Sequence, residues 1–92
     1  MLEDVKRALR VSTAYFDVDV QDLIDAAKAD LVLSGVLSAK IVDTDSLIKR
    51  AVILYSKSSF GLDNVDSEKY MASYMSLKVH LTLSQEYTVE VV

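Results

Sequence analysis

The chain has 92 residues, of which 51% are hydrophobic, and its formal net charge at pH 7 is -4. This length fits one domain spanning residues 1–92. Acidic residues outnumber basic ones, which argues against a phosphate-binding surface, and the lack of cysteine excludes disulfides and thiolate metal sites. No run approaches the roughly 18 apolar residues that a membrane span needs, and the first ten residues do not resemble a signal peptide.

The apolar content is high for so short a chain, and the mean hydropathy is positive. A domain of this size buries only roughly 60–65% of the surface that its unfolded chain exposes. The excess has two interpretations, a well-filled core or a surface that another subunit covers. The second is reasonable because obligate interfaces resemble a core cut in half.

A first short helix is predicted over residues 2–10. Leu2, Val5 and Leu9 recur there at helical spacing and form one apolar stripe. Turn-forming residues interrupt the pattern afterwards, at positions 11–16. The aromatic pair Tyr15 and Phe16 in this break is expected to form an apolar plug beneath the next helix.

A second amphipathic helix is predicted over residues 19–34. Its apolar stripe consists of Val20, Leu23, Ile24, Ala27 and Leu31. Asp17 or Asp19 is expected to cap its start. Gly35 suits the left-handed position after the helix, where Leu31 and Val36 would complete a Schellman ending.

The connection over residues 36–45 is rich in aliphatic side chains, including Leu37, Ile41 and Val42. Loops usually lie on the surface, so these side chains either pack back on the core or meet another chain. Ile41 and Val42 also allow an extended hairpin. Both alternatives stay open at this point.

A third helix, over residues 46–60, is predicted to be central because its middle turns are apolar nearly all round. Asp43 or Asp45 is expected to cap it, and Gly61 to end it. A fourth helix follows over residues 67–84. Its apolar stripe consists of Tyr70, Tyr74, Leu77 and Leu81, with Met71 and Met75 beside it.

The last six residues change from helical spacing to alternation, which predicts a short strand over residues 87–92. Tyr87, Val89 and Val91 would share one face. A single strand cannot satisfy its own backbone groups. It would therefore pair with the 36–45 connection, with a neighbouring copy or with a partner, unless the tail is frayed. We take Leu37, Ile41, Val42, Tyr87, Val89 and Val91 as candidate interface residues.

No pattern in the chain indicates catalysis, a cofactor or a metal. An EF-hand starting at Asp17 would need glycine at Asp22 and glutamate at Lys28. His80 is the only histidine and has no second histidine or cysteine with which to share a metal. The fold class predicted is therefore mainly α, a small four-helix bundle-like domain with a short C-terminal β-strand, and the protein is not expected to be an enzyme.

The order of these helices resembles the small head–tail connector, or head-completion adaptor, proteins of tailed bacteriophages and related prophages. The resemblance covers about residues 2–81 and rests on core patterns. Those patterns are Leu2-x-x-Val5-Lys6-x-x-Leu9-Arg10, Asp19-x-x-x-Leu23-Ile24-x-Ala26-Ala27-Lys28, Leu47-Ile48-x-x-Ala51-Val52-x-Leu54-Tyr55, Phe60-Gly61, and Glu68, Tyr70, Tyr74 and Leu77 in the last helix.

The resemblance implies a structural protein of the virion, made in the host bacterial cytoplasm. It implies a homo-oligomeric ring below the portal protein that extends the DNA channel without binding DNA specifically. The ring would offer a docking surface to a head-closure or tail protein. The alternative, from a different class, is a small helical interaction module, regulatory or antitoxin-like, that binds one protein partner.

Overall fold

The computed structural model describes residues 1–61 and 64–90, and these residues form helices and connections but no strand. The elements are α1 (Leu2–Leu9), η1 (Ala14–Phe16), α2 (Asp17–Leu33), η2 (Ser38–Lys40), α3 (Ser46–Ser59), α4 (Ser67–Leu83) and α5 (Gln85–Thr88). Of these, η1 and η2 are single 3₁₀ turns and α5 is a single α-helical turn. The body measures 43 × 24 × 19 Å, so it is longer than it is thick.

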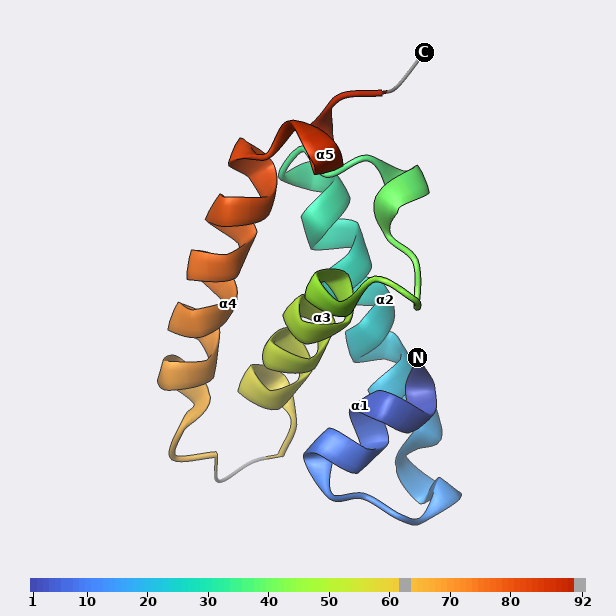
Figure 1. The fold of residues 1–92 in the computed structure, drawn as a ribbon. Helices are drawn as coiled ribbons and strands as arrows, with labels where there is room; N and C mark the ends of the chain where they lie inside the picture. The colour runs from blue at the N-terminus through green and yellow to red at the C-terminus, as the bar shows by residue number, and fades with distance from the viewer. Residues whose placement is uncertain (62–63, 91–92) are drawn as a thin grey trace.

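The predicted central helix is confirmed: α3 packs against α1, α2 and α4 (Figure 1). Its two sides contribute to two buried clusters. Ile48 and Leu54 join one cluster, beside Tyr74 and Leu81 of α4, and Val52 joins the other with side chains of α1 and α2. The helix is not buried all round, however, because Leu47 is 47% exposed.

Two of the predicted helix ends are confirmed by hydrogen bonds. Asp45 Oδ1 accepts from the backbone N–H groups of Leu47 and Ile48 at 2.9 and 3.1 Å, as an N-cap does. After α2, the N–H of Val36 donates to the carbonyl of Leu31, and the N–H of Gly35 donates to that of Val32. With Gly35 at φ 115°, these bonds form the Schellman ending.

The start of α2 differs from the prediction. No side chain caps this helix: Phe16 precedes it, and Asp17 is its first residue. Asp17 instead lies 2.7 Å from the Nζ of Lys6 in α1. Tyr15 is not part of an apolar plug, since it is 82% exposed, whereas the ring of Phe16 packs edge-on against Phe60 at 5.6 Å between centroids.

The predicted C-terminal strand is wrong for the residues that the structure describes. Tyr87 and Thr88 end α5, residues 89–90 are irregular, and residues 91–92 lie outside the described part. The physical reason is local satisfaction of the backbone. The N–H groups of Tyr87 and Val89 donate to the carbonyls of Ser84 and Gln85, so the segment needs no neighbouring strand.

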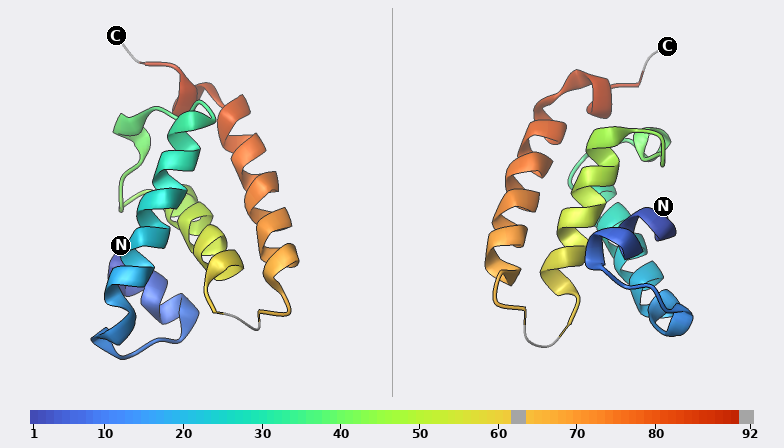
Figure 2. Two further views of the ribbon diagram at one scale, coloured as in Figure 1. Left: turned by 180° about the vertical axis from the view of Figure 1, so that it is seen from behind. Right: turned by 60° about the horizontal axis from the view of Figure 1, so that its bottom comes forward.

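Most connections lie at the two ends of the body, whereas the second half of the 36–45 connection runs along its side to Met1 and Lys28 (Figure 1 and Figure 2). At one end, α5 lies beside the end of α2 and the first part of the 36–45 connection. At the other end lie η1, the last turn of α3 and the first turn of α4. Both ends therefore combine segments that are distant in the sequence.

Candidate interaction surfaces

The C-terminal turn is anchored on the 36–45 connection within one chain. Tyr87 is only 6% exposed, and its hydroxyl donates to the Asp45 carboxylate at 3.0 and 3.2 Å. The N–H of Leu37 donates to the Tyr87 carbonyl at 2.9 Å. Burial raises the pKa of Tyr87 to about 12, and the hydrogen bond to Asp45 adds to the effect. Of the alternatives that the sequence left open for this segment, the structure shows contact with the 36–45 connection of the same chain, made without a strand.

The other predicted interface residues lie further out. Ile41 is half-buried against the core, while Val42 is 44% and Val89 is 51% exposed. Val91 lies outside the described residues. The structure thus leaves Val42 and Val89 on the surface.

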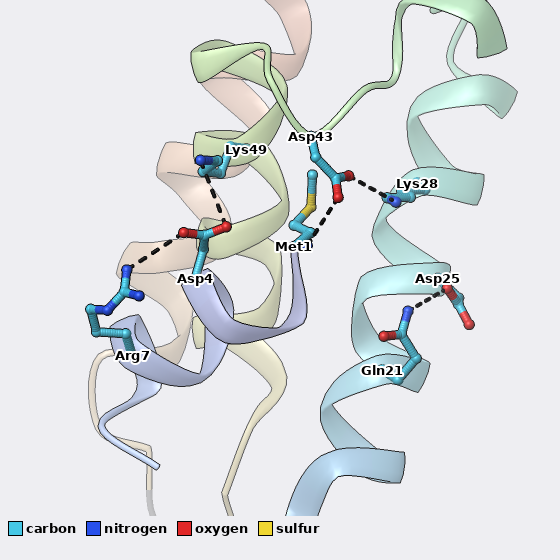
Figure 3. Close-up of polar contacts among 8 residues, drawn as sticks. All are labelled: Met1, Asp4, Arg7, Gln21, Asp25, Lys28, Asp43 and Lys49. Carbon is cyan, nitrogen blue, oxygen red and sulfur yellow. Dashed lines mark hydrogen bonds and ion pairs between the residues drawn. The ribbon is translucent and has the colours of Figure 1, made fainter. Parts of the chain in front are cut away.

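Polar contacts attach the 36–45 connection to α1 and α2 (Figure 3). The amino group of Met1 lies 3.0 Å from Asp43 Oδ2, and Lys28 Nζ lies 3.6 Å from Asp43 Oδ1. The hydrogen bond from the Met1 amino group, which outweighs the cost of desolvation, holds the pKa of Asp43 below its usual value. Nearby, Lys49 of α3 lies 3.6 Å from Asp4 of α1. The two contacts of Asp43 hold the 36–45 connection in place, while the Lys49–Asp4 pair joins α3 to α1.

A second set of polar contacts joins Asp30 of α2 to Tyr74 and Lys78 of α4. The Tyr74 hydroxyl donates to Asp30 Oδ2, and Lys78 Nζ lies 3.0 Å from the same oxygen. Burial alone would raise the pKa of Asp30, but the donors Tyr74 and Lys78 outweigh it and hold that pKa below its usual value. Burial and the hydrogen bond to Asp30 raise the pKa of the Tyr74 hydroxyl far above its usual value. The carboxylate therefore stays ionised and keeps the two helices together at neutral pH.

Apolar side chains are exposed near the C-terminal ends of α2 and α4, which sequence reasoning missed. Leu33 is 87%, Leu83 79% and Val79 52% exposed. The available signal was that Val79 and Leu83 fall outside the Tyr70–Leu81 stripe, so α4 is apolar on more than one side. Such side chains fit contact with another protein, although single exposed apolar residues are also common.

A groove of about 490 Å³ lies between the start of α2 and the end of α3. Phe16, Leu23 and Phe60 provide its apolar surface, and Asp19 and Asp22 lie at the same groove. Both aspartates are exposed, and neither makes an ion pair with a residue in the described part of the chain. The groove therefore combines an apolar lining with unneutralised negative charge.

The described residues do not gather three or more His, Asp or Glu side chains in a place that could hold a metal ion. His80 is exposed on α4. Within residues 1–61 and 64–90, no helix has the length and apolar character needed to cross a membrane. The groove between α2 and the end of α3 and a second groove beside α1 are open depressions on the surface.

An all-helical domain with these exposed apolar and charged surfaces is typical of a protein that acts through contact with other proteins. The comparison with protein families agrees: the chain belongs to the phage connector protein family, whose model matches residues 1–88. This confirms the resemblance seen in the sequence. Members are structural proteins not known as enzymes, and membership implies association with other phage head–tail proteins. Searches of curated proteins and of solved structures found no significant match.

Proposed function

We propose that the protein is a subunit of the head–tail connector, which assembles into a ring below the portal protein and extends the channel through which DNA passes. The ring would present a docking surface to the next head-completion or tail protein. The observation that carries this proposal is the family match across residues 1–88, nearly the whole chain. The virion is then the place where the protein acts.

The surfaces of the molecule support this proposal. Exposed apolar residues occur at both ends of the body, with Val18 73% exposed on α2 and Leu83 79% exposed on α4. A subunit in a ring has a neighbour on each side and further proteins above and below. Such a subunit covers more of its surface than a free monomer does. Neighbours would contact the segments that carry the candidate interface residues Leu37, Ile41, Val42, Tyr87, Val89 and Val91, of which Val42 and Val89 are exposed and Val91 lies outside the described residues.

The proposal is tested by mixing the purified protein with the portal protein of the same phage and imaging the complex by electron microscopy. Native mass spectrometry of the protein alone gives its free oligomeric state. Rings seated on the portal are the expected result. A stable dimer that does not bind the portal would favour the alternative function, a small helical module that binds one protein partner. A chain that stays monomeric and binds neither the portal nor a tail protein would contradict the connector role.

A further inference from the structure

The groove between α2 and the end of α3 has a defined chemistry. Its lining includes the edge-to-face pair of Phe16 and Phe60, with Leu23 beside them. Asp19 and Asp22, one turn apart on α2, add two negative charges. An occupant that suits this groove carries an apolar side chain for the lining and a cation for the aspartates.

The same chain presents such a combination at the start of α3. Leu47 is 47% exposed, and Arg50, three residues later, lies on the same side of the helix. Arg50 is exposed and makes no ion pair with any residue in the described part of the chain. A guanidinium with free donors suits carboxylates well, because it can engage them with paired hydrogen bonds.

We infer that the groove of one copy receives the Leu47–Arg50 side of α3 from a second copy. In this contact, Leu47 packs on the aromatic lining, and Arg50 lies between Asp19 and Asp22. The two sites on one chain are complementary in charge and in apolar surface. The inference rests on the proposed connector function, because it names the surfaces through which neighbouring ring subunits meet.

The positions of the two sites decide the kind of assembly. Leu47 lies at the start of α3 and Phe60 just after its end, so the sites are about 20 Å apart along the helix at a rise of about 1.5 Å per residue. A copy that inserts its Leu47–Arg50 side into a neighbour still has its own groove open. Because the contact joins two different surfaces, it can run head-to-tail from copy to copy, and the connector role requires that it repeats until the rotation between subunits closes a ring.

Site-specific cross-linking tests the contact, because the chain has no cysteine of its own. Ser46→Cys protein, changed beside Leu47, is mixed with Ser59→Cys protein, changed in the groove lining, alone and with the portal, and treated with a short bismaleimide. Both serines are exposed, and these variants keep Arg50 and both aspartates. We expect a dimer that contains one copy of each variant. The matched control replaces Ser59→Cys by Glu86→Cys, because Glu86 is also exposed but lies on α5, at the other end of the body.

Charge reversal supplies an independent measurement. Arg50→Glu and Asp22→Lys should each weaken self-association about tenfold or more, because like charges then face each other. A mixture of the two variants should associate again, since every contact in an alternating array pairs opposite charges. Both substitutions lie on the surface, and circular dichroism verifies that each variant is folded. Restored association in the mixture is a result that a merely misfolded variant could not produce.

The outcomes separate this inference from the connector role. If rings form on the portal but the Ser46–Ser59 cross-link does not, the contact is wrong and the role stands. If the cross-link forms without portal binding, the contact stands and the role fails. Absence of the cross-link in both conditions, or equal linking in the Glu86 control, overturns the inferred contact.

Discussion

Leu54 shows most directly how the central helix stabilises the fold. It is 7% exposed and belongs to the buried cluster that joins α3 to Tyr74 and Leu81 of α4. Leu54→Ala should lower the free energy of unfolding by about 2–5 kcal/mol, because it removes buried methyl groups and leaves a cavity. Urea denaturation gives this value. A cost below about 1 kcal/mol would contradict the packing of α3.

The tie between Tyr74 and Asp30 gives a prediction with a pH signature. Tyr74→Phe should cost about 1–2 kcal/mol at neutral pH, because the hydroxyl donates to a charged acceptor. The pKa of Asp30 is lower in the folded chain than in the unfolded one. Its contribution to stability is therefore present above the unfolded pKa and is lost as the pH falls below about 4, through the folded pKa.

The Tyr74→Phe variant should lose less unfolding free energy than the wild type when the pH falls. In this variant Asp30 keeps only Lys78 as a donor, so the pKa of Asp30 moves back toward its usual value. Urea denaturation of both proteins at pH 7 and pH 3 provides the comparison. If the difference in unfolding free energy between the two proteins is the same at pH 7 and at pH 3, Tyr74 does not influence the pKa of Asp30.

At the scale of elements, α5 belongs to the folded body. Tyr87→Ala should cost about 3 kcal/mol, because its buried ring packs in the same cluster as Val36 and Leu81. Val89→Ala is the matched control. Val89 is two residues away and 51% exposed, so its change should stay within about 0.5 kcal/mol. Thermal unfolding of both variants gives the measurement, and equal effects would mean that α5 is not docked.

The four main helices could be predicted from sequence because their signals are local. The spacing of Val20, Ile24 and Leu31 fixes the buried side of α2, and these residues are all fully buried. The helix ends at Asp45 and Gly35 are formed by hydrogen bonds between residues no more than five positions apart. Such signals depend mainly on neighbouring residues, and the exception is the start of α2, where Asp17 pairs with Lys6 of α1 and does not cap the helix.

The C-terminal element and the groove could not be predicted because distant residues determine them. Alternation at Tyr87 and Val89 fits a strand, but the anchor of Tyr87 is Asp45, 42 positions earlier. Phe16 and Phe60 meet only once α2 and α3 have packed together. No local pattern records such encounters, so the sequence indicates surplus apolar surface without showing where it lies.

At the scale of the whole molecule, the net charge of -4 leads to a prediction about DNA. A channel wall that conducts DNA should not hold it, and negative charge repels the phosphates. We expect no measurable binding of duplex DNA to the isolated protein at physiological salt, as judged by fluorescence anisotropy. Firm binding under these conditions would contradict the proposed role in the channel.

The double use of Asp45 has a consequence for the mechanics of the molecule. Its carboxylate caps the first turn of α3 and also accepts the hydroxyl of Tyr87. The free-energy costs of Asp45→Ala and Tyr87→Phe should therefore be non-additive in a double-mutant cycle. Unfolding of α5 and unfolding of the first turn of α3 are then thermodynamically coupled. A pulling force that detaches α5 should therefore also destabilise the first turn of α3, which carries Leu47.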